Sequence, residues 1–515
     1  MNIVFRVDSS IKIGSGHLVR CINLAKELIK KNISISFLSR AHLGNLNELV
    51  KKEGFNLITL KKKDIYDESD EDYSSWLGVS QKDDAIESID AMGNLECDLL
   101  IIDHYGIDHE WEKTLKNKAK KILVIDDLAN RKHECDFLLD HNYRIDSKKR
   151  YLNLIQEKTE LLVGPEFALL NEAFYQNRKI KKYSEKEYIN LFIFLSSNIR
   201  QDLIYRFIKI LEKKDFNKIK THIVLGKNAS IISNIREIKR ENPNINFYEY
   251  LPNLAKLMVN SDIAIGAGGV TTLERMCVGL PSIVISIAEN QEEICIDLQK
   301  LKLIDYLGKA HDVKDEDIRS ALLKIISDRK YLREHSLKIQ SFVDGLGAKR
   351  LAEYLLPAKK ESYKIREACM KDMLTFFRWT NEPEVRKNSL NSDNIKLESH
   401  IDWYKEKLKS KYSFLYILES NDLPVGQIRF EVEDKYAIIN YSIDYMVRGR
   451  GLANVLLSLG IKEFKKINKI PLLAIVKSRN ISSIKSFIRL GFVEKDENDD
   501  SIKRFVLNIE DQENL

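Results

Sequence analysis

Long apolar runs are absent from this sequence. No stretch approaches the ~18 consecutive apolar residues that a membrane-spanning helix requires, so no such helix is expected. The opening residues, MNIVFRV, read as a short strand and carry a charge at Arg6, which is unlike the apolar segment of a secretory signal peptide. The sequence therefore predicts a cytoplasmic protein with no membrane partner.

Clustered cysteines are absent as well. The six cysteines are scattered, with no CxxC pair and no cysteine–histidine cluster at the spacing of a zinc site. They are Cys21, Cys97, Cys135, Cys277, Cys295 and Cys369. This distribution predicts free thiols in a reducing compartment, and no metal is expected.

A strong excess of charge of either sign is also absent. The 83 basic and 77 acidic residues are mixed along the chain and leave a formal charge of +6. So small an imbalance over 515 residues gives no support to nucleic-acid binding. The length, with 44% hydrophobic residues, instead predicts roughly three globular domains of about 150 to 200 residues each.

Strand and helix patterns alternate over residues 1–165. Short apolar runs typical of buried strands are separated by amphipathic stretches such as residues 18–31. The runs cover residues 2–7, 33–39, 97–106 and 120–129. The alternation predicts a parallel sheet of βαβ units, in which polar residues at the carboxyl ends of the strands share one edge. The residues expected there are Asp8, Asp103, His104, Asp126 and Asp127.

A second cycle of the same kind follows over residues 166–350. Its expected strands are residues 188–197, 220–226, 245–251, 261–269 and 281–288. Two Rossmann-like halves in tandem, with the chemistry in a cleft between them, are the simplest architecture. A proline and a lysine-rich polar run predict a linker over residues 351–362, and residues 363–510 then predict a smaller α+β domain.

In that last domain an expected strand, residues 436–447, runs into the turn RGRGLA and a helix over residues 452–466. Glycines two apart at a helix start expose backbone amides and suit a pyrophosphate. The turn resembles the acyl-CoA signature of the GCN5-related N-acetyltransferases (GNAT), and residues 472–492 resemble the closing segment of that superfamily. The resemblance implies acetyl-CoA as the co-substrate. The contacts that it implies are Met446 and Val447 at the thioester and pantetheine, the turn Arg448, Gly449, Arg450, Gly451, Leu452 and Ala453 at the pyrophosphate, and Asn480.

The stretch GAGGVTTLERMCVGLPSIVISIAENQ, residues 266–291, combines glycines after a strand with an acid one turn into the next helix. On position alone, Glu274 either favours the helix dipole or accepts both hydroxyls of a ribose. The pattern resembles the nucleotide-binding half of the GT-B enzymes related to the peptidoglycan N-acetylglucosaminyltransferase. This resemblance implies a UDP site with Gly268, Gly269, Glu274 on the ribose, and Asn290 and Gln291 near the sugar or phosphates.

The first half carries FRVDSS, GSGH followed by Arg20, IIDHYG, DDLANRKHECDFLLDHN and GPEFALLNEAF in this order. On its own His17 is either a helix-start residue or a catalytic group. Together the motifs resemble the UDP-2,4-diacetamido-2,4,6-trideoxy-β-L-altropyranose hydrolases of pseudaminic acid biosynthesis. The resemblance implies that His17 is the base that activates water against the anomeric carbon, without a metal; a helix amino end suits a neutral imidazole. The substrate contacts that it implies are Gly14, Gly16, Arg20, Asp103, His104 and Tyr105.

Two positions depart from these families. Phe487 stands where many GNAT enzymes have a tyrosine that protonates the leaving thiolate, and Tyr441 and Ser442 are both candidates for that role. Residues 196–199, Ser-Ser-Asn-Ile, replace a glycine-rich motif after the first strand of the second half, where serine hydroxyls can still bind a phosphate. His400 is open between acceptor binding and packing.

The sequence as a whole predicts a bifunctional enzyme of pseudaminic acid biosynthesis. The GNAT domain would acetylate the 4-amino group of a UDP-4-amino-4,6-dideoxy sugar, and the GT-B part would hydrolyse UDP from the doubly N-acetylated product. Two alternatives stay open: a glycosyltransferase fused to the acetyltransferase, and a non-catalytic UDP-sugar-binding scaffold for it. The expected partners are a UDP-linked amino sugar and acetyl-CoA, and the oligomeric state is left open.

Overall fold

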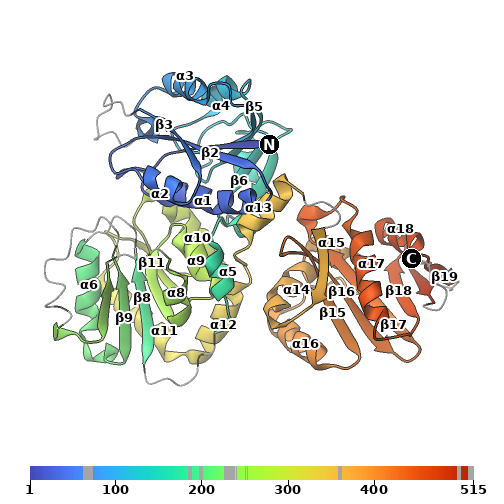
Figure 1. Cartoon of the computed structure of the whole chain (residues 1–515). Helices are drawn as coiled ribbons and strands as arrows, with labels where there is room; N and C mark the ends of the chain where they lie inside the picture. Colours follow the sequence, from blue (N-terminus) through green and yellow to red (C-terminus); the bar gives the residue numbers. More distant parts are fainter. Residues whose placement is uncertain are drawn as a thin grey trace. The chain divides into compact units, whose positions relative to one another are not determined.

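The computed structural model of the chain falls into two compact units, Met1–Ala352 and Glu353–Leu515 (Figure 1). The division lies at the start of the segment for which the sequence predicts a linker. The residues that the structure describes are 1–61, 73–181, 183, 188–195, 201–225, 238, 240–249, 251, 253–357, 362–495 and 500–508.

The first unit opens with a seven-stranded parallel sheet in the order β3-β2-β1-β4-β5-β6-β7. Its strands are β1 (Asn2–Val7), β2 (Ser34–Arg40), β3 (Asn56–Leu60), β4 (Cys97–Asp103), β5 (Ala119–Ile125), β6 (Phe137–Asp140) and β7 (Glu160–Val163). The chain runs outward from β1 to β3 and then returns to β4 on the other side of β1. The carboxyl ends of β1 and β4 therefore form the switch point at which sheets of this type bind ligands.

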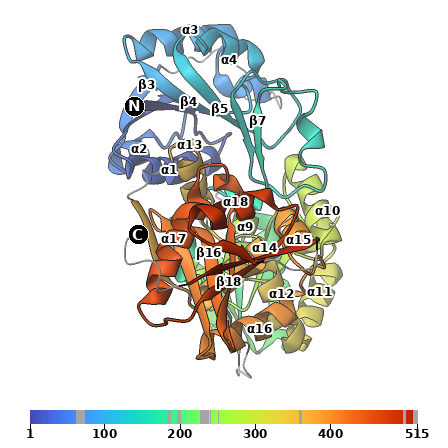
Figure 2. The same cartoon turned by 90° about the vertical axis from the view of Figure 1, so that its right-hand side faces the viewer.

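Helices cover both faces of this sheet, as parallel crossovers require. Figures 1 and 2 both show α1 and α2 on one side of the sheet and α3 and α4 on the other. These helices are α1 (Gly16–Ile29), α2 (Asn47–Lys52), α3 (Gln81–Met92) and α4 (His109–Leu115), with 3-10 turns η1 (Tyr73–Leu77), η2 (Lys149–Tyr151) and η3 (Pro165–Phe167). The next helix, α5 (Glu172–Asn177), packs on the second half through Phe174. In α1 the buried Leu18, Cys21, Leu24 and Leu28 recur at helical spacing, which fixes the face that lies on the sheet.

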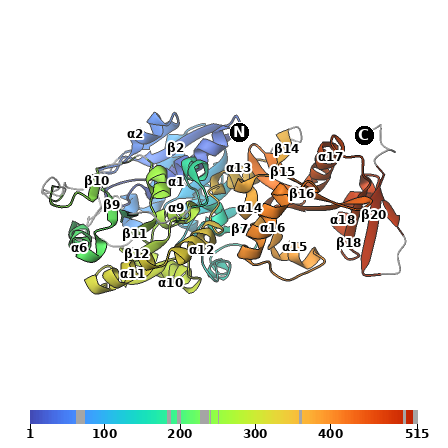
Figure 3. The same cartoon turned by 90° about the horizontal axis from the view of Figure 1, so that it is seen from below.

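A six-stranded parallel sheet follows, in the order β10-β9-β8-β11-β12-β13, which repeats the order of the first six strands. Its strands are β8 (Ile189–Phe194), β9 (Ile219–Val224), β10 (Ile245–Tyr248), β11 (Ile263–Ala267), β12 (Ser282–Ser286) and β13 (Asp305–Lys309). Its helices are α6 (Gln201–Leu211), α8 (Ala255–Asn260), α9 (Thr271–Cys277), α10 (Glu292–Lys300), α11 (Asp315–Ser327), α12 (Arg329–Gln340) and α13 (Gly347–Leu355), with 3-10 turns η4 (Lys214–Phe216) and η5 (Glu289–Gln291). Figure 3 shows α10, α11 and α12 along one side of β11 and β12.

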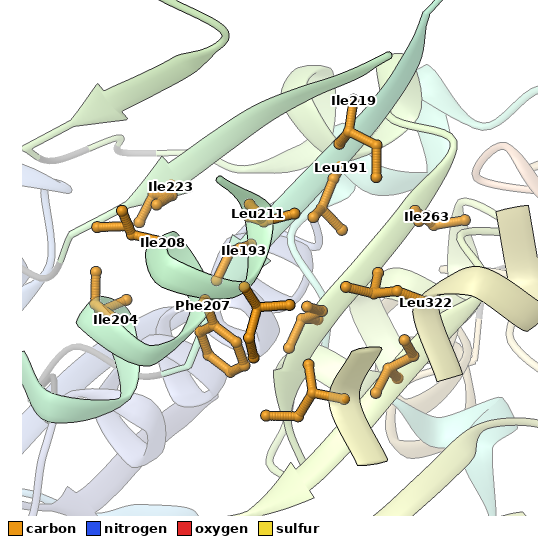
Figure 4. Packing of buried hydrophobic residues seen from close by; sticks show 14 of the residues in the cluster. Leu191, Ile193, Ile204, Phe207, Ile208, Leu211, Ile219, Ile223, Ile263 and Leu322 are labelled. Carbon is orange, nitrogen blue, oxygen red and sulfur yellow. The ribbon is translucent and has the colours of Figure 1, made fainter. Parts of the chain in front are cut away.

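Apolar side chains hold α6 against this second sheet (Figure 4). Phe207 and Ile208 of α6 belong to the same buried cluster as Leu191 of β8, Ile223 of β9 and Leu322 of α11. β11 and β12 are buried along their whole length, so both faces of these strands lie inside the protein.

The second unit is an α+β domain around a seven-stranded sheet in the order β14-β15-β16-β17-β18-β20-β19. Its strands are β14 (Tyr363–Glu367), β15 (Ser413–Ser420), β16 (Leu423–Glu433), β17 (Tyr436–Ile443), β18 (Leu472–Lys477), β19 (Val493–Lys495) and β20 (Ile502–Leu507). Its helices are α14 (Met373–Thr380), α15 (Pro383–Asn388), α16 (Leu397–Lys409), α17 (Leu452–Lys465) and α18 (Ile481–Arg489), with 3-10 turns η7 (Met370–Asp372) and η8 (Tyr445–Val447). All strand pairs are antiparallel except β17 with β18.

The parallel pair β17 and β18 is short. The two strands pair only over Ala437–Ile439 and Leu472–Ala474, and beyond these residues they separate. The ends of both strands are thus free of each other, and the sheet opens at this point.

The expected strand over residues 436–447 is too long. β17 ends at Ile443, because the Asp444 side chain accepts the amide of Met446 at 3.1 Å and turns the chain into η8. Across the residues that the structure describes, no helix is both long and apolar enough to cross a membrane.

Leu191 lies at the centre of the second sheet and is 0% exposed. Leu191→Ala should lower the free energy of unfolding of the first unit by about 2–5 kcal/mol, because the shortened side chain leaves a cavity in the buried core. Leu152→Ala, at a residue that is 69% exposed, is the control and should change it by less than about 0.5 kcal/mol. Urea unfolding followed by circular dichroism measures both, and equal stability of the two variants would contradict this packing.

Candidate functional site

The loop before α1 leaves open backbone at the switch point of the first sheet. Gly14 has a φ of 79° and its amide donates to the carbonyl of Ser10 at 2.9 Å. No atom of the described chain lies within 4 Å of the position that a β-carbon would take at Gly14 or Gly16. The protein's described residues therefore leave room beside the start of α1, where His17 follows.

His17 is held by the strand that faces it. Its Nδ1 lies 2.6 Å from Oδ1 of Asp103, the last residue of β4. An ionised carboxylate can only accept, so this contact, shorter than the 3.2 Å approach of an Arg20 nitrogen to the same Nδ1, favours a proton on Nδ1 and leaves Nε2 as the acceptor. Among the residues that the structure describes, Nε2 has no hydrogen-bond partner, and the side chain is 8% exposed.

Arg20, one turn further along α1, neutralises Asp103. Its Nε and one terminal nitrogen donate to the two carboxylate oxygens of Asp103, each at 2.6 Å. Burial alone would raise the pKa of Asp103, but Arg20 and His17 outweigh it and hold that pKa below its usual range. Asp103 thus stays ionised and fixes the tautomer of His17.

Arg20 also positions His17 indirectly, through Asp127 and Tyr105. Arg20 donates to Asp127 at 3.2 Å, and the Tyr105 hydroxyl donates to the same carboxylate. The Tyr105 ring meets the His17 ring edge to face, with centroids 4.5 Å apart. The imidazole is therefore clamped both through Nδ1 and through its ring, and Asp127 acts by positioning Tyr105.

The expected edge residues Asp103 and Asp127 are bridged by Arg20, which donates to both, and they follow the neighbouring strands β4 and β5. His104 points the other way. It is 2% exposed, its Nδ1 accepts the amide of Gly106 at 3.0 Å, and its Nε2 lies 3.3 Å from the buried Asp8. Nδ1 is hydrogen-bonded and Nε2 faces Asp8 without a hydrogen bond among the described residues, so the ring is buried in the protein and its substrate contact stays a prediction.

Asp8 belongs to a buried ion network behind the site. Arg6 donates to Asp8 at 2.6 Å and to Asp84 of α3 at 2.8 Å, and Arg40 donates to Asp84. All four side chains are fully buried. Because removing one member would leave a charge unpaired, this network fixes the end of β1 to α3.

In the second half, a buried arginine shapes the turn after β11. Arg275 is 0% exposed and donates to the carbonyl of Ala267 at 2.9 Å and to the Ser282 hydroxyl at 3.0 Å. A β-carbon at Gly266 would lie 2.3 Å from this guanidinium, and one at Gly268 would lie 2.4 Å from the sulfur of Cys295. Gly266 and Gly268 are thus required for the turn itself, whereas a β-carbon at Gly269 would make only an ordinary contact with Gln291.

Glu274 lies beside that turn with an unsatisfied oxygen. Its Oε2 is buried and has no hydrogen-bond partner among the described residues. Burial, opposed by Arg275, raises the pKa of Glu274 to about 7. A buried carboxyl oxygen without a partner fits a site whose missing partner is a ligand hydroxyl.

Gln291 is hydrogen-bonded to backbone amides, whereas Asn290 is exposed. The side-chain carbonyl of Gln291 accepts the amides of Gly268 at 3.2 Å and Ile287 at 3.1 Å, so it supports the glycine turn. α10 begins directly after these two residues and is tied to the first half, because Arg144 donates to Glu293 at 2.7 Å and to Asp297 at 2.9 Å.

In the second unit, a cavity of about 870 Å³ lies where β17 and β18 separate. Its lining includes Val447, Arg448, Gly449, Gly451, Leu452, Ala453 and Asn480 of the expected acetyl-CoA contacts. Gly449 and Gly451 have φ values of 77° and 75°, and nothing described lies within 4 Å of a β-carbon at either. The first amides of α17 have no partner within their own helix, so this wall presents free donors to the cavity.

Three of the expected acetyl-CoA contacts are engaged elsewhere. The amides of Met446 and Val447 donate to the side chain and the carbonyl of Asp444, both at 3.1 Å. Arg450 donates to the carbonyls of Glu353 and Tyr354 at 3.1 and 3.2 Å and does not line the cavity. In the structure these two amides and the Arg450 guanidinium bond within the turn, and the free amides lie further along, at the start of α17; the roles that the resemblance implies for them stay predictions.

The side chains considered for proton donation and acceptor binding in the second unit differ in their surroundings. Phe487 is 2% exposed and packs edge to face on Tyr441, with ring centroids 5.7 Å apart. Tyr441 lines the cavity, and its hydroxyl donates to Ser483 at 3.0 Å. Burial raises the pKa of Tyr441. His400 is 1% exposed and its Nε2 lies 3.0 Å from the carbonyl of Met373, which favours packing over acceptor binding.

Residues 196–199, where the sequence departs from the glycine motif, lie outside the described residues. Over the described ranges, no three His, Cys, Asp or Glu side chains gather so as to hold a metal ion. Sequence reasoning missed Arg275 and Trp76 of η1. No motif in the sequence distinguishes Arg275 from its neighbour Glu274. Trp76 follows a polar segment in which no helix or strand periodicity can be recognised.

Comparison with known protein families finds one match in each unit. Residues 190–351 match the glycosyltransferase family 28 C-terminal domain, and residues 364–493 match the acetyltransferase (GNAT) domain. With the parallel sheets of the first unit and the mixed sheet of the second, these matches confirm the expected fold class: two Rossmann-like halves in a GT-B arrangement followed by an α+β GNAT domain.

Similar proteins cover both the whole chain and its first unit. An uncharacterized protein of Methanocaldococcus jannaschii, MJ1062, is 23% identical over 96% of this chain and 96% of its own length. The UDP-2,4-diacetamido-2,4,6-trideoxy-β-L-altropyranose hydrolase of Campylobacter jejuni is 28% identical over 58% of this chain and 97% of its own length. The spore coat polysaccharide biosynthesis protein SpsG of Bacillus subtilis is 25% identical over 50% and 76%. The resemblance stated from the sequence motifs is thereby confirmed.

The raised pKa of Glu274 predicts how the stability of the folded chain depends on pH. Its folded pKa of about 7 exceeds the unfolded value, so the folded state binds the extra proton and loses stability as pH rises from about 4.5 to about 7. Glu274→Gln should therefore be more stable than the wild type at pH 8, by up to about 3 kcal/mol. The gain should vanish near pH 4.5. Thermal unfolding across this pH range measures the difference, and a less stable variant at pH 8 would contradict the assignment.

Proposed function

We propose that this chain, which joins a glycosyltransferase family 28 C-terminal domain to a GNAT domain, catalyses two consecutive steps on a UDP-linked amino sugar. The second unit acetylates the 4-amino group of a UDP-4-amino-4,6-dideoxy sugar from acetyl-CoA. The first unit then hydrolyses UDP from the 2,4-diacetamido product, a reaction of pseudaminic acid biosynthesis. The acetyltransferase step is supported by the GNAT domain, and the hydrolase step by the Campylobacter relative.

In the hydrolysis, Nε2 of His17 takes a proton from a water molecule. The water oxygen forms a bond to the anomeric carbon, and the bond from that carbon to the diphosphate oxygen breaks. Its electron pair leaves with UDP, and the sugar is released with inverted configuration. Asp103 stabilises the imidazolium that forms, and Arg20 keeps Asp103 in place and ionised.

The nucleotide is assigned to the second half. Glu274 accepts the ribose hydroxyls through the oxygen that otherwise has no partner, and the turn at Gly268 and Gly269 lies beside the phosphates. Arg275 and Gln291 hold that turn from behind. The observation that carries the hydrolase proposal is the His17–Asp103 pair, in which one ring nitrogen is fixed and the other is left to accept.

In the acetyl transfer, acetyl-CoA lies in the cavity of the second unit with its pyrophosphate at the start of α17. The neutral sugar amine attacks the thioester carbonyl, and the carbon–sulfur bond breaks as the tetrahedral intermediate collapses. Tyr441 protonates the leaving thiolate. A phenol suits this step better than Ser442, because its pKa is far closer to that of a thiol and its hydroxyl stays protonated when buried.

Glycosyl transfer is the alternative that the family 28 match favours for the first unit. It uses the same UDP site and the same bond cleavage, but a sugar hydroxyl replaces water as the nucleophile. The products separate the two: free sugar indicates hydrolysis, and a disaccharide indicates transfer.

His17→Asn should reduce UDP release from the UDP-diacetamido sugar by at least about 10²-fold, since general bases contribute 10²–10⁴-fold. Asp103→Asn should also reduce it, mainly in kcat, because the imidazole loses its tautomer and orientation. His311→Asn is the matched control, at a histidine side chain that is 70% exposed in the same unit. UDP release by His17→Asn at the wild-type rate would overturn the base assignment.

Tyr441→Phe should slow CoA thiol release by about 10²-fold in kcat while the KM for acetyl-CoA stays nearly unchanged. Ser442→Ala should have little effect, and Tyr412→Phe, at a residue that is 67% exposed, controls for loss of a hydroxyl. Hydrolysis of the pre-acetylated substrate by the same variants checks that the first unit is intact. A larger loss in Ser442→Ala than in Tyr441→Phe would contradict the assignment.

A further inference from the structure

Three aromatic side chains form a continuous wall beside His17. Trp76 and Tyr105 stack with centroids 5.4 Å apart, and Tyr73 meets both rings edge on, at 5.0 and 5.1 Å. The His17 ring lies 4.5 Å from Tyr105 and 6.0 Å from Trp76. The wall therefore adjoins the imidazole that is proposed to activate water.

The wall is built from two segments and is partly open. Tyr105 follows β4 and is 7% exposed, whereas Tyr73 and Trp76 belong to η1 and are each half-buried. The hydroxyl of Tyr105 is engaged by Asp127, so this residue contributes its ring rather than its polar end. Trp76 is the tryptophan of the first unit that remains accessible, because Trp111 is 1% exposed and donates to Asp84.

Charges from both halves act on Tyr73. Besides burial, the negative charges of Asp127 and of Glu289, in the 3-10 turn that also contains Gln291, raise the pKa of the Tyr73 phenol.

We propose that Tyr73, Trp76 and Tyr105 form a sugar subsite that takes a methyl-bearing face of a UDP-linked hexose, as in a 6-deoxy sugar, and discriminates against a 6-hydroxyl. This inference rests on the proposed function in assigning a UDP-sugar to the site. A methyl group gains contact with the ring faces. A hydroxyl in the same place loses its hydrogen bonds to water, because ring faces offer no comparable partner.

The test uses two ligands that differ by one oxygen, UDP-N-acetylglucosamine and its 6-deoxy analogue. Calorimetric titration of the full chain should give a Kd about tenfold lower for the 6-deoxy ligand, from roughly 4-fold for the methyl group and a few-fold for the lost hydroxyl. Trp76→Gln should reduce this ratio to about 2 or less, whereas Trp76→Phe, which keeps an aromatic ring, should retain most of it. Equal binding of the two ligands by the wild type, or an unchanged ratio in Trp76→Gln, would overturn the proposal.

Tryptophan fluorescence provides a second reading that does not depend on Trp76→Gln folding. The 6-deoxy ligand should change the emission of the wild type, and the change should be lost in Trp76→Phe but kept in Trp403→Phe, a matched variant in the second unit. An identical change in Trp76→Phe would contradict the subsite. UDP release is followed in parallel: absence of turnover with the preference retained defeats the hydrolase proposal alone, and turnover without the preference defeats the subsite alone.

Discussion

The bidentate ion pair between Arg20 and Asp103 is the contact on which the first site depends. It joins α1 to the end of β4 across the switch point of the sheet, and it holds Asp103 ionised although the carboxylate is fully buried. Only an ionised Asp103 fixes the proton of His17 on Nδ1 and leaves Nε2 as a base. Because Arg20 also holds Asp127, and Asp127 holds Tyr105, one guanidinium positions the imidazole, its aromatic neighbour and the wall that continues from it.

The second half and the second unit follow a different principle, in which the fold leaves polar groups unsatisfied. Among the described residues, Glu274 keeps a buried oxygen without a partner, and burial raises the pKa of its carboxyl. In the GNAT domain the separation of β17 from β18 opens a cavity beside the free amides of α17. In both places the missing partner is supplied by a ligand in the proposed reactions.

Much of this could be predicted from sequence, because buried parallel strands are continuous apolar runs and the glycine turns follow them directly. β3, β6, β7 and β13 are not predicted: each has four or five residues, one or more of its end residues is polar or charged, and its apolar run is shorter still, whereas the equally short β12 is buried along its whole length. The motifs placed His17, Arg20, Asp103 and Glu274, but motif position does not show which way a side chain points. His104 and Arg450 turn inward because Asp8 and the carbonyls of Glu353 and Tyr354 hold them there, and such long-range partners leave no local pattern.

In the proposed hydrolysis water attacks the anomeric carbon and not phosphorus, and turnover of the UDP-diacetamido sugar in ¹⁸O-labelled water tests this most directly. Mass spectrometry of the released UDP reports which bond breaks, because its phosphate oxygens do not exchange with water on this timescale. The account predicts unlabelled UDP together with free sugar. Incorporation of ¹⁸O into UDP would show attack at phosphorus and would contradict the role given to His17.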